Sequence, residues 1–443
     1  MPGIARDPER LLVRELGLRQ LTAHIFNYTV GSGIFVLPAI AVAQLGTAAP
    51  LAYLVCATVM ALVVMVFMEA GSRVTITGGP YAYVEVGLGP FFGFVTGVLL
   101  AVATVTAGGA IAALLGQTAA RLLGLDGAAW SAVMTLLLVG VLVAVNVRGL
   151  RWGARLVEWS TAAKLVPLLA FVLVGAWFVD PDNLRIDAWP SASAVTATSG
   201  VLVFAFLGIE SALGPTGEVR DAARTVPRAV ALALLAATLL YLAIQLVALG
   251  VLGPLLATDT VAPLASAAGV FAGNAGASFL LAGATISMLG WVTGAVLAAP
   301  RTFFALARDG FLPRQLARVH ERHRTPHVAI VFYGVVVALV SLTGTFTQLA
   351  VVANLAVLAV YALGAVAVLA LRRKDIRSEG VAPLRVPGGP LVPVLTCLLI
   401  GWIAWQTATP REAVAFAIVW AVALPLYLWR RGRTSHHPSP GTT

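Results

Sequence analysis

A glycine-interrupted apolar segment near the N-terminus is the first feature of this sequence that could do chemistry. The segment reads IFNYTVGSGIFVLPAIA and places Gly31, Ser32 and Gly33 in its middle. Two glycines around a serine favour unwinding of a helix over its continuation. Small residues also let two helices pack closely, so this segment alone leaves both interpretations open.

A second interrupted segment, VFAFLGIESALGPTGE, tips the balance toward a functional break. It carries Gly208, Gly214, Pro215 and a carboxylate, Glu210, inside an apolar run. An unwound helix exposes the N–H groups of one half and the carbonyl groups of the other, which can bind an anionic and a cationic group together. Because an amino acid zwitterion presents both groups, and paired interruptions mark transporter sites, the two segments predict an amino acid site.

Lys164 is a cation inside a third apolar segment. It lies nine residues after Arg155, roughly 13 Å further along a helix, which is a long way for a side chain to reach back to water. Burial disfavours a charged ammonium, so Lys164 could exchange a proton during transport. The alternative is a lysine at the edge of a water-filled vestibule with no coupling role. We expect Glu210 either to position the unwound segment or to relay protons.

The elements that must position these residues are membrane helices. Hydrophobic residues make up 59% of the 443 residues and charged residues only 11%, far below the roughly 25% of soluble proteins. About 20 apolar residues cross a bilayer. This length predicts an all-α integral membrane protein with twelve spans near residues 21–45, 51–72, 90–117, 129–147, 156–178, 195–215, 228–253, 275–304, 328–345, 348–371, 391–408 and 412–430.

The positive charges predict the orientation of these spans. Of the 29 Lys and Arg residues, 25 fall in the termini and connections of one side, whereas only Arg121, Arg185 and Arg411 fall on the other. This asymmetry predicts that both termini are cytoplasmic, in a multi-pass protein of the cytoplasmic membrane. It also explains the net charge of +10 without nucleic acid as a partner, while the basic loops would contact anionic lipid headgroups.

Five short blocks between residues 31 and 326 carry a resemblance to a known family. They are Gly31-Ser32-Gly33-Ile34-Phe35; Gly78-Gly79-Pro80-Tyr81-Ala82-Tyr83; Phe206-Leu207-Gly208-Ile209-Glu210-Ser211; Glu218-Val219-Arg220 with Pro227-Arg228-Ala229; and Arg308-Asp309-Gly310-Phe311-Leu312-Pro313 with Thr325-Pro326. In this order they resemble the amino acid–polyamine–organocation superfamily of transporters.

The resemblance implies a LeuT-type fold, in which two inverted repeats of five helices are followed by two further helices. In this chain it implies a cytoplasmic segment (1–20), the first repeat (21–180), the second repeat (190–371), two additional helices (390–431) and a cytoplasmic tail (432–443).

The resemblance also assigns a carboxylate site. The backbone amides of Ser32, Gly33 and Ile34 would bind the substrate carboxylate, and Gly31 and Gly208 would lie in the unwound segments.

The remaining roles implied by the resemblance concern the amino group, the gates and coupling. Carbonyl groups near Thr29, Phe204 and Leu207 would take the substrate amino group. Phe204 stands where many relatives place an aromatic gate, and Trp291 matches a tryptophan that closes the pocket floor in some members, although a lone membrane tryptophan also packs. Lys164 resembles a lysine of proton-linked and exchanger members, whose ammonium takes the place of a sodium ion.

Departures from the family pattern bear on the substrate. Ala70 and Thr75 stand where relatives usually have leucine and proline, and Gly108 falls near a polar position of an arginine-transporting relative. With little acid lining the site, a cationic substrate would lack a partner. We therefore expect neutral, moderately apolar amino acids.

The combined prediction is a secondary active amino acid transporter that works by alternating access, with proton-coupled uptake. The alternatives are obligate amino acid exchange and transport of cationic amino acids or polyamines. A competing class of function is an amino acid sensor without transport activity, or an efflux system for amino acids or polyamines. An enzyme would need a nucleophile–base pair or metal ligands at membrane depth, and His24 is the one histidine within an expected span. We therefore expect no enzyme activity, no metal and no cofactor. The sequence does not determine the oligomeric state.

Overall fold

A computed structural model shows that the chain is helical throughout the part that it describes, without β-strands in that part. The described residues are 17–31, 33–74, 79–125, 127–148, 150–186, 188–208, 222–308, 312–321, 323, 325–377 and 383–434.

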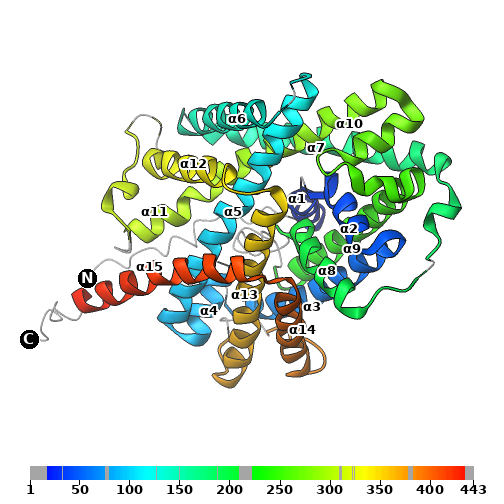
Figure 1. The fold of residues 1–443 in the computed structure, drawn as a ribbon. Helices are drawn as coiled ribbons and strands as arrows, with labels where there is room; N and C mark the ends of the chain where they lie inside the picture. The colour runs from blue at the N-terminus through cyan, green and yellow to red at the C-terminus, as the bar shows by residue number, and fades with distance from the viewer. Residues whose placement is uncertain are drawn as a thin grey trace, which may run out of the picture. The chain divides into compact units, whose positions relative to one another are not determined.

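The α-helices follow one another along the chain (Figure 1). They are α1 (Leu18–Thr29), α2 (Leu37–Leu45), α3 (Ala49–Arg73), α4 (Pro80–Leu88), α5 (Pro90–Leu122), α6 (Ala128–Arg148), α7 (Leu150–Gly175), α8 (Ala192–Phe206), α9 (Ala222–Leu252), α10 (Pro263–Ala298), α11 (Pro300–Arg308), α12 (His327–Ser341), α13 (Phe346–Arg373), α14 (Leu391–Thr407) and α15 (Pro410–Thr434). Short 3₁₀ turns are η2 (Gly33–Phe35), η3 (Gly46–Ala48), η4 (Ala176–Phe178), η5 (Pro181–Leu184), η8 (Gly253–Thr258) and η9 (Arg314–Ala317).

Prolines begin several of these helices. Pro38, Pro50, Pro80 and Pro263 occupy the first turns of α2, α3, α4 and α10, where the missing N–H group costs no hydrogen bond. Helix α4 was not among the expected segments, because its nine residues are too few to span a bilayer.

Helices of the described part overlap each of the twelve expected segments, although the segment 21–45 is broken after Thr29 and the segment 195–215 is described only as far as Gly208. Seven helical stretches of the described part are long and apolar enough to cross a membrane. They are Leu37–Arg73, Pro90–Leu122, Ala128–Arg148, Arg228–Thr258, Pro263–Phe304, Phe346–Arg373 and Pro410–Leu428. Shorter apolar helices cover Ala163–Phe178, Ala192–Phe206, His327–Ser341 and Leu391–Thr407. The largest shift is in α10, which begins twelve residues before the expected span and is kinked at Gly273.

The described helices fall into two compact units. Unit 1 contains the described residues within 1–96, 179–258 and 357–406, and unit 2 those within 97–178, 259–356 and 407–443. The expected broken segments, α1–α2 and α8, therefore both belong to unit 1, together with α3 and α9.

In unit 1, α1 packs on α9, and α3 packs on both α8 and α9. Ser199 of α8 reinforces this packing, because its hydroxyl lies 3.1 Å from the Ala52 carbonyl of α3 and 2.7 Å from the Val195 carbonyl of its own helix. Polar side chains in these apolar helices thus reach backbone carbonyls, which avoids the cost of burying an unpaired group.

In unit 2, α10 packs on α7 and α12 packs on α6. Small residues allow close contact: a Cβ atom at Gly283 would overlap the ring of Pro167. At Gly108 of α5, a Cβ atom would lie 2.7 Å from the Tyr333 hydroxyl oxygen. The polar position of the arginine-transporting relative is therefore filled here by packing.

Candidate functional site

The first expected break is present in the structure. Helix α1 ends at Thr29, a single 3₁₀ turn covers Gly33–Phe35, and α2 begins at Leu37. At the end of α1, the Gly31 N–H donates to the Thr29 carbonyl at 2.8 Å instead of to a carbonyl one turn earlier. The prediction of an interrupted first segment is thus confirmed, while Ser32 itself lies outside the described residues.

The second expected break begins where α8 ends at Phe206. Leu207 is extended, with φ −61° and ψ 140°, and Gly208 has φ +106°, a left-handed conformation that side chains with a Cβ atom rarely adopt. Residues 209–221, which include Glu210, lie outside the described part. The helix therefore stops close to the predicted glycine.

The two breaks lie against each other in unit 1. A Cβ atom placed on Gly33 would lie 3.3 Å from Phe204 Cδ1 and 3.6 Å from Ala205 Cα. It would also lie 3.1 Å from Leu37 Cδ1, so glycine is the residue that lets the first break approach the last turn of α8. Gly33, Ile34 and Phe204 are all buried.

Tyr241 of α9 bridges the two breaks and was missed in the sequence. Its hydroxyl oxygen lies 2.7 Å from the Thr29 carbonyl and 2.7 Å from the Ala205 carbonyl. A hydroxyl has one hydrogen, so it can donate fully to one of these carbonyls at a time. A tyrosine in the apolar run LLYLAIQL is the signal that could have drawn attention, because a buried tyrosine hydroxyl usually needs a partner.

The Thr29 carbonyl is already occupied in this conformation. It accepts from the Gly31 N–H at 2.8 Å and faces the Tyr241 hydroxyl, which accounts for the two lone pairs of a carbonyl oxygen. A substrate ammonium that binds this oxygen must therefore replace one of these donors.

Lys164 and Trp291 belong to unit 2, whereas the predicted residues at the breaks belong to unit 1. Lys164 lies in α7 with only 6% of its surface exposed, as expected for a lysine that cannot reach water freely. Trp291 is half-buried in α10. Within the described residues, no group of three or more His, Cys, Asp or Glu side chains could hold a metal ion.

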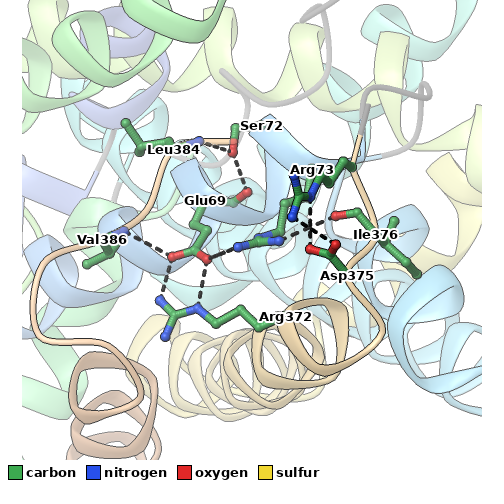
Figure 2. Close-up of polar contacts among 9 residues, drawn as sticks. Glu69, Ser72, Arg73, Arg372, Asp375, Ile376, Leu384 and Val386 are labelled. Atoms are coloured by element: carbon green, nitrogen blue, oxygen red, sulfur yellow. Dashed lines mark hydrogen bonds and ion pairs between the residues drawn. The ribbon is translucent and has the colours of Figure 1, made fainter. Parts of the chain in front are cut away.

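A buried charge cluster lies elsewhere in unit 1, at the end of α3 (Figure 2). Glu69 has no exposed surface, and the fork of Arg372 binds its two carboxylate oxygens at 2.7 and 2.5 Å. Arg73 binds the same carboxylate at 2.9–3.0 Å, and the Val386 N–H donates to it at 3.1 Å. The contact with Arg73 lies within α3, four residues along the helix, whereas Arg372 comes from α13, 303 residues away in the sequence.

The Glu69 cluster joins α3 to two other parts of unit 1. Ser72 extends the junction, because its hydroxyl donates to the Glu69 carbonyl at 2.8 Å and accepts from the Leu384 N–H at 3.0 Å. Arg73 also reaches the Ile376 carbonyl at 3.4 Å. The cluster therefore ties α3 to the end of α13 and to the chain that leads into α14, and its acid is fully bonded.

Comparison with known proteins shows the family of the chain. The family described as amino acid permease matches residues 16–427, nearly the whole chain. The chain belongs to the amino acid permease family. This permease is therefore a multi-pass membrane protein of a family of transporters, and the predicted resemblance to the wider superfamily is confirmed.

Relatives of the permease cover almost its full length. It is 27% identical to the branched-chain amino acid permease BcaP of Bacillus subtilis, over 90% of each chain. It is 28% identical to the serine/threonine exchanger SteT of the same organism, over 95% of this chain and 98% of SteT. It is also 28% identical to the methylthioribose transporter of Bacillus subtilis, over 91% and 90% of the two chains.

Proposed function

We propose that this permease is a secondary active transporter that takes up neutral amino acids across the cytoplasmic membrane, coupled to protons, by alternating access. The observation that carries the proposal is the pair of helix breaks that meet at Gly33 and Tyr241 in unit 1. Broken helices near the middle of a membrane supply free backbone groups of both signs, which suit a zwitterion.

In this proposal the substrate carboxylate binds the amides of Ser32, Gly33 and Ile34. The substrate amino group binds carbonyls near Thr29, Phe204 and Leu207, and displaces a donor from the Thr29 oxygen. Phe204 acts as the aromatic gate of the site, and Gly31 and Gly208 contribute to substrate binding in the two breaks. These roles agree with the broken ends of α1 and α8.

We assign proton coupling to Lys164, with Glu210 as a positioning or relay residue. The burial of Lys164 supports this role, because an ammonium removed from water gives up its proton more readily. Replacing Lys164 with alanine should abolish the dependence of uptake on external pH, measured as initial rates in proteoliposomes. Replacing the exposed cation Arg185 in the same way is the control. If the alanine variant remains as pH-sensitive as the wild type, Lys164 does not carry the proton.

Obligate exchange is the second candidate, and a specific relative favours it. SteT, at 28% identity over nearly the whole of both chains, is named as a serine/threonine exchanger. BcaP is named as a permease for branched-chain amino acids. Together these names support neutral amino acids, either apolar or hydroxylated, and leave both kinds of coupling to be tested.

Uptake of labelled isoleucine and serine into proteoliposomes tests the proposal. One set of empty vesicles receives an inward proton gradient, and a second set without a gradient is preloaded with the unlabelled amino acid. We expect accumulation in the first set. Uptake only into preloaded vesicles would establish exchange, and a lack of uptake in both sets, together with thermal stabilisation by arginine or polyamines, would contradict the substrate class.

A further inference from the structure

Gln245 of α9 is a buried polar residue that no part of the proposed mechanism uses. Its side chain has no exposed surface. Neither its amide nitrogen nor its amide oxygen has a hydrogen-bond partner among the residues that the structure describes. Buried polar groups in native proteins are almost always paired, so two unpaired atoms on one side chain call for a partner beyond the described residues.

The position of Gln245 relates it to the helix breaks. It follows Tyr241 by four residues, so the two side chains share one face of α9. Side chains in a helix lean toward its N-terminus, which directs the Gln245 amide toward the turn that carries Tyr241. The Tyr241 hydroxyl in turn contacts the carbonyls at both breaks.

An aromatic cluster surrounds Tyr241 and contains a further unpaired group. The ring of Phe206 lies 5.3 Å from the Tyr241 ring, and the ring of Tyr53 lies 6.4 Å from it. The Tyr53 hydroxyl is buried and also lacks a hydrogen-bond partner in the described part of the chain. The region behind the breaks therefore contains more hydrogen-bonding capacity than the described residues satisfy.

The chemistry of the amide identifies the kind of partner. Gln245 offers a donor and an acceptor side by side, whereas a carboxylate only accepts and an ammonium only donates. A hydroxyl group does both. We propose that Gln245 binds a hydroxyl group beside the helix breaks, supplied either by water or by the side chain of the transported amino acid. The second source rests on the proposed function, and the first does not.

The test compares Gln245→Met with Tyr83→Phe. Methionine keeps the length of glutamine and removes both polar atoms. Tyr83 of α4 is the control, because its buried hydroxyl is also unpaired in the described residues and no role at the breaks is assigned to it. For each variant we would measure the melting temperature of the full chain in detergent without substrate, and the KM values for serine and alanine, which differ by one hydroxyl.

The outcomes separate the two sources. If Gln245 binds a substrate hydroxyl, Gln245→Met should melt at a higher temperature than the wild type, as Tyr83→Phe should. Its KM for serine should rise roughly tenfold, and its KM for alanine should not change. Water predicts a lower melting temperature, with equal changes in both KM values. A higher melting temperature with an unchanged ratio of KM values would overturn the proposal. If the wild type transports neither amino acid, the proposed function fails separately; a lower melting temperature of Gln245→Met then still supports bound water, and a higher one overturns it.

Discussion

The helix breaks and the Glu69 cluster are two polar regions of unit 1 that treat their hydrogen bonds differently. In the Glu69 cluster, one carboxylate receives two guanidinium groups and a backbone N–H, which occupy both of its oxygens. At the breaks, a single hydroxyl from Tyr241 serves two carbonyls. In the first region both carboxylate oxygens have donors, whereas in the second one hydroxyl lies between two carbonyl oxygens.

The difference teaches how to separate structural from functional polarity inside a membrane protein. A carboxylate enclosed by side chains of its own chain has no oxygen left for a ligand, however buried and charged it is. A hydroxyl that lies between two carbonyls can be displaced from one of them, and in the proposed function a substrate ammonium takes its place. Whether each polar atom already has its hydrogen-bond partners therefore distinguishes these regions better than charge or burial does. The following substitutions test that distinction.

Glu69→Gln should have the largest effect. The amide would keep the shape of the carboxylate but remove the negative charge that the buried Arg73 and the half-buried Arg372 share. Removing one partner of a buried ion pair typically costs about 3–5 kcal/mol. We expect a loss of this order in the free energy of unfolding, measured by thermal or denaturant unfolding in detergent.

The exposed pair of Asp182 and Arg185, which also belongs to unit 1, provides the control for Glu69. Its side chains are bonded at 3.1 Å. Because both groups are exposed to water, Asp182→Asn should leave the free energy of unfolding unchanged. Equal stability of the two variants would mean that the Glu69 cluster adds nothing to the fold.

Tyr241→Phe should have a smaller effect on stability but a specific effect on transport. The substitution removes a side-chain hydroxyl that contacts both breaks, at a cost of about 1 kcal/mol. The same energy corresponds to roughly a fivefold change in KM if the breaks bind substrate. Both quantities can be measured, by unfolding in detergent and by uptake in proteoliposomes.

Tyr333 of unit 2 is the matched control for Tyr241. It is also fully buried, and its hydroxyl donates to the Thr104 carbonyl at 3.1 Å, which lies within the continuous helix α5. Tyr333→Phe should lower stability to a similar degree without changing KM. A change in KM for Tyr333→Phe, with no change for Tyr241→Phe, would contradict the assignment of substrate binding to the helix breaks.

Much of the fold could be predicted because long apolar runs report membrane helices directly. The early start of α10 could not, since Pro263 begins it in a weakly apolar stretch and Gly273, with φ +59°, kinks it. Helix α4 was not predicted because its nine residues are fewer than the roughly 20 needed to cross a bilayer.

The breaks were visible in the sequence, whereas their partners were not. Glycines such as Gly31 and Gly208 show locally that a helix is interrupted. Tyr241 follows Thr29 by 212 residues and Arg372 follows Glu69 by 303 residues, and no local pattern pairs residues at such separations. Tertiary packing alone decides which carbonyls and carboxylates find a donor.

Asp259 of unit 2 sharpens the comparison, because its carboxylate is saturated but only partly buried, with 17% of the side chain exposed. It accepts hydrogen bonds from Arg121 at 2.9 Å, Ser266 at 2.5 Å and the N–H groups of Val261 and Ala262 at 3.1 and 3.0 Å. Burial alone would raise the pKa of Asp259, but these bonds lower it to about 2. Because Asp259 is only partly buried, its substitution should lower the free energy of unfolding less than the substitution of Glu69 does.

The sign of this effect follows from the lowered pKa. The stabilisation from Asp259 is present above the usual pKa of an aspartate, roughly 4, and is lost as the pH falls toward about 2, where the folded state takes up the proton. Asp259→Asn should lower stability by less than about 1 kcal/mol near neutral pH, since its partner Arg121 is well exposed, and the difference from wild type should shrink on acidification. Asp182→Asn, in the exposed pair with Arg185, is the control. A difference at Asp259 that stays constant with pH would show that its bonds to N–H and O–H groups, which a neutral amide can also accept, matter more than its charge.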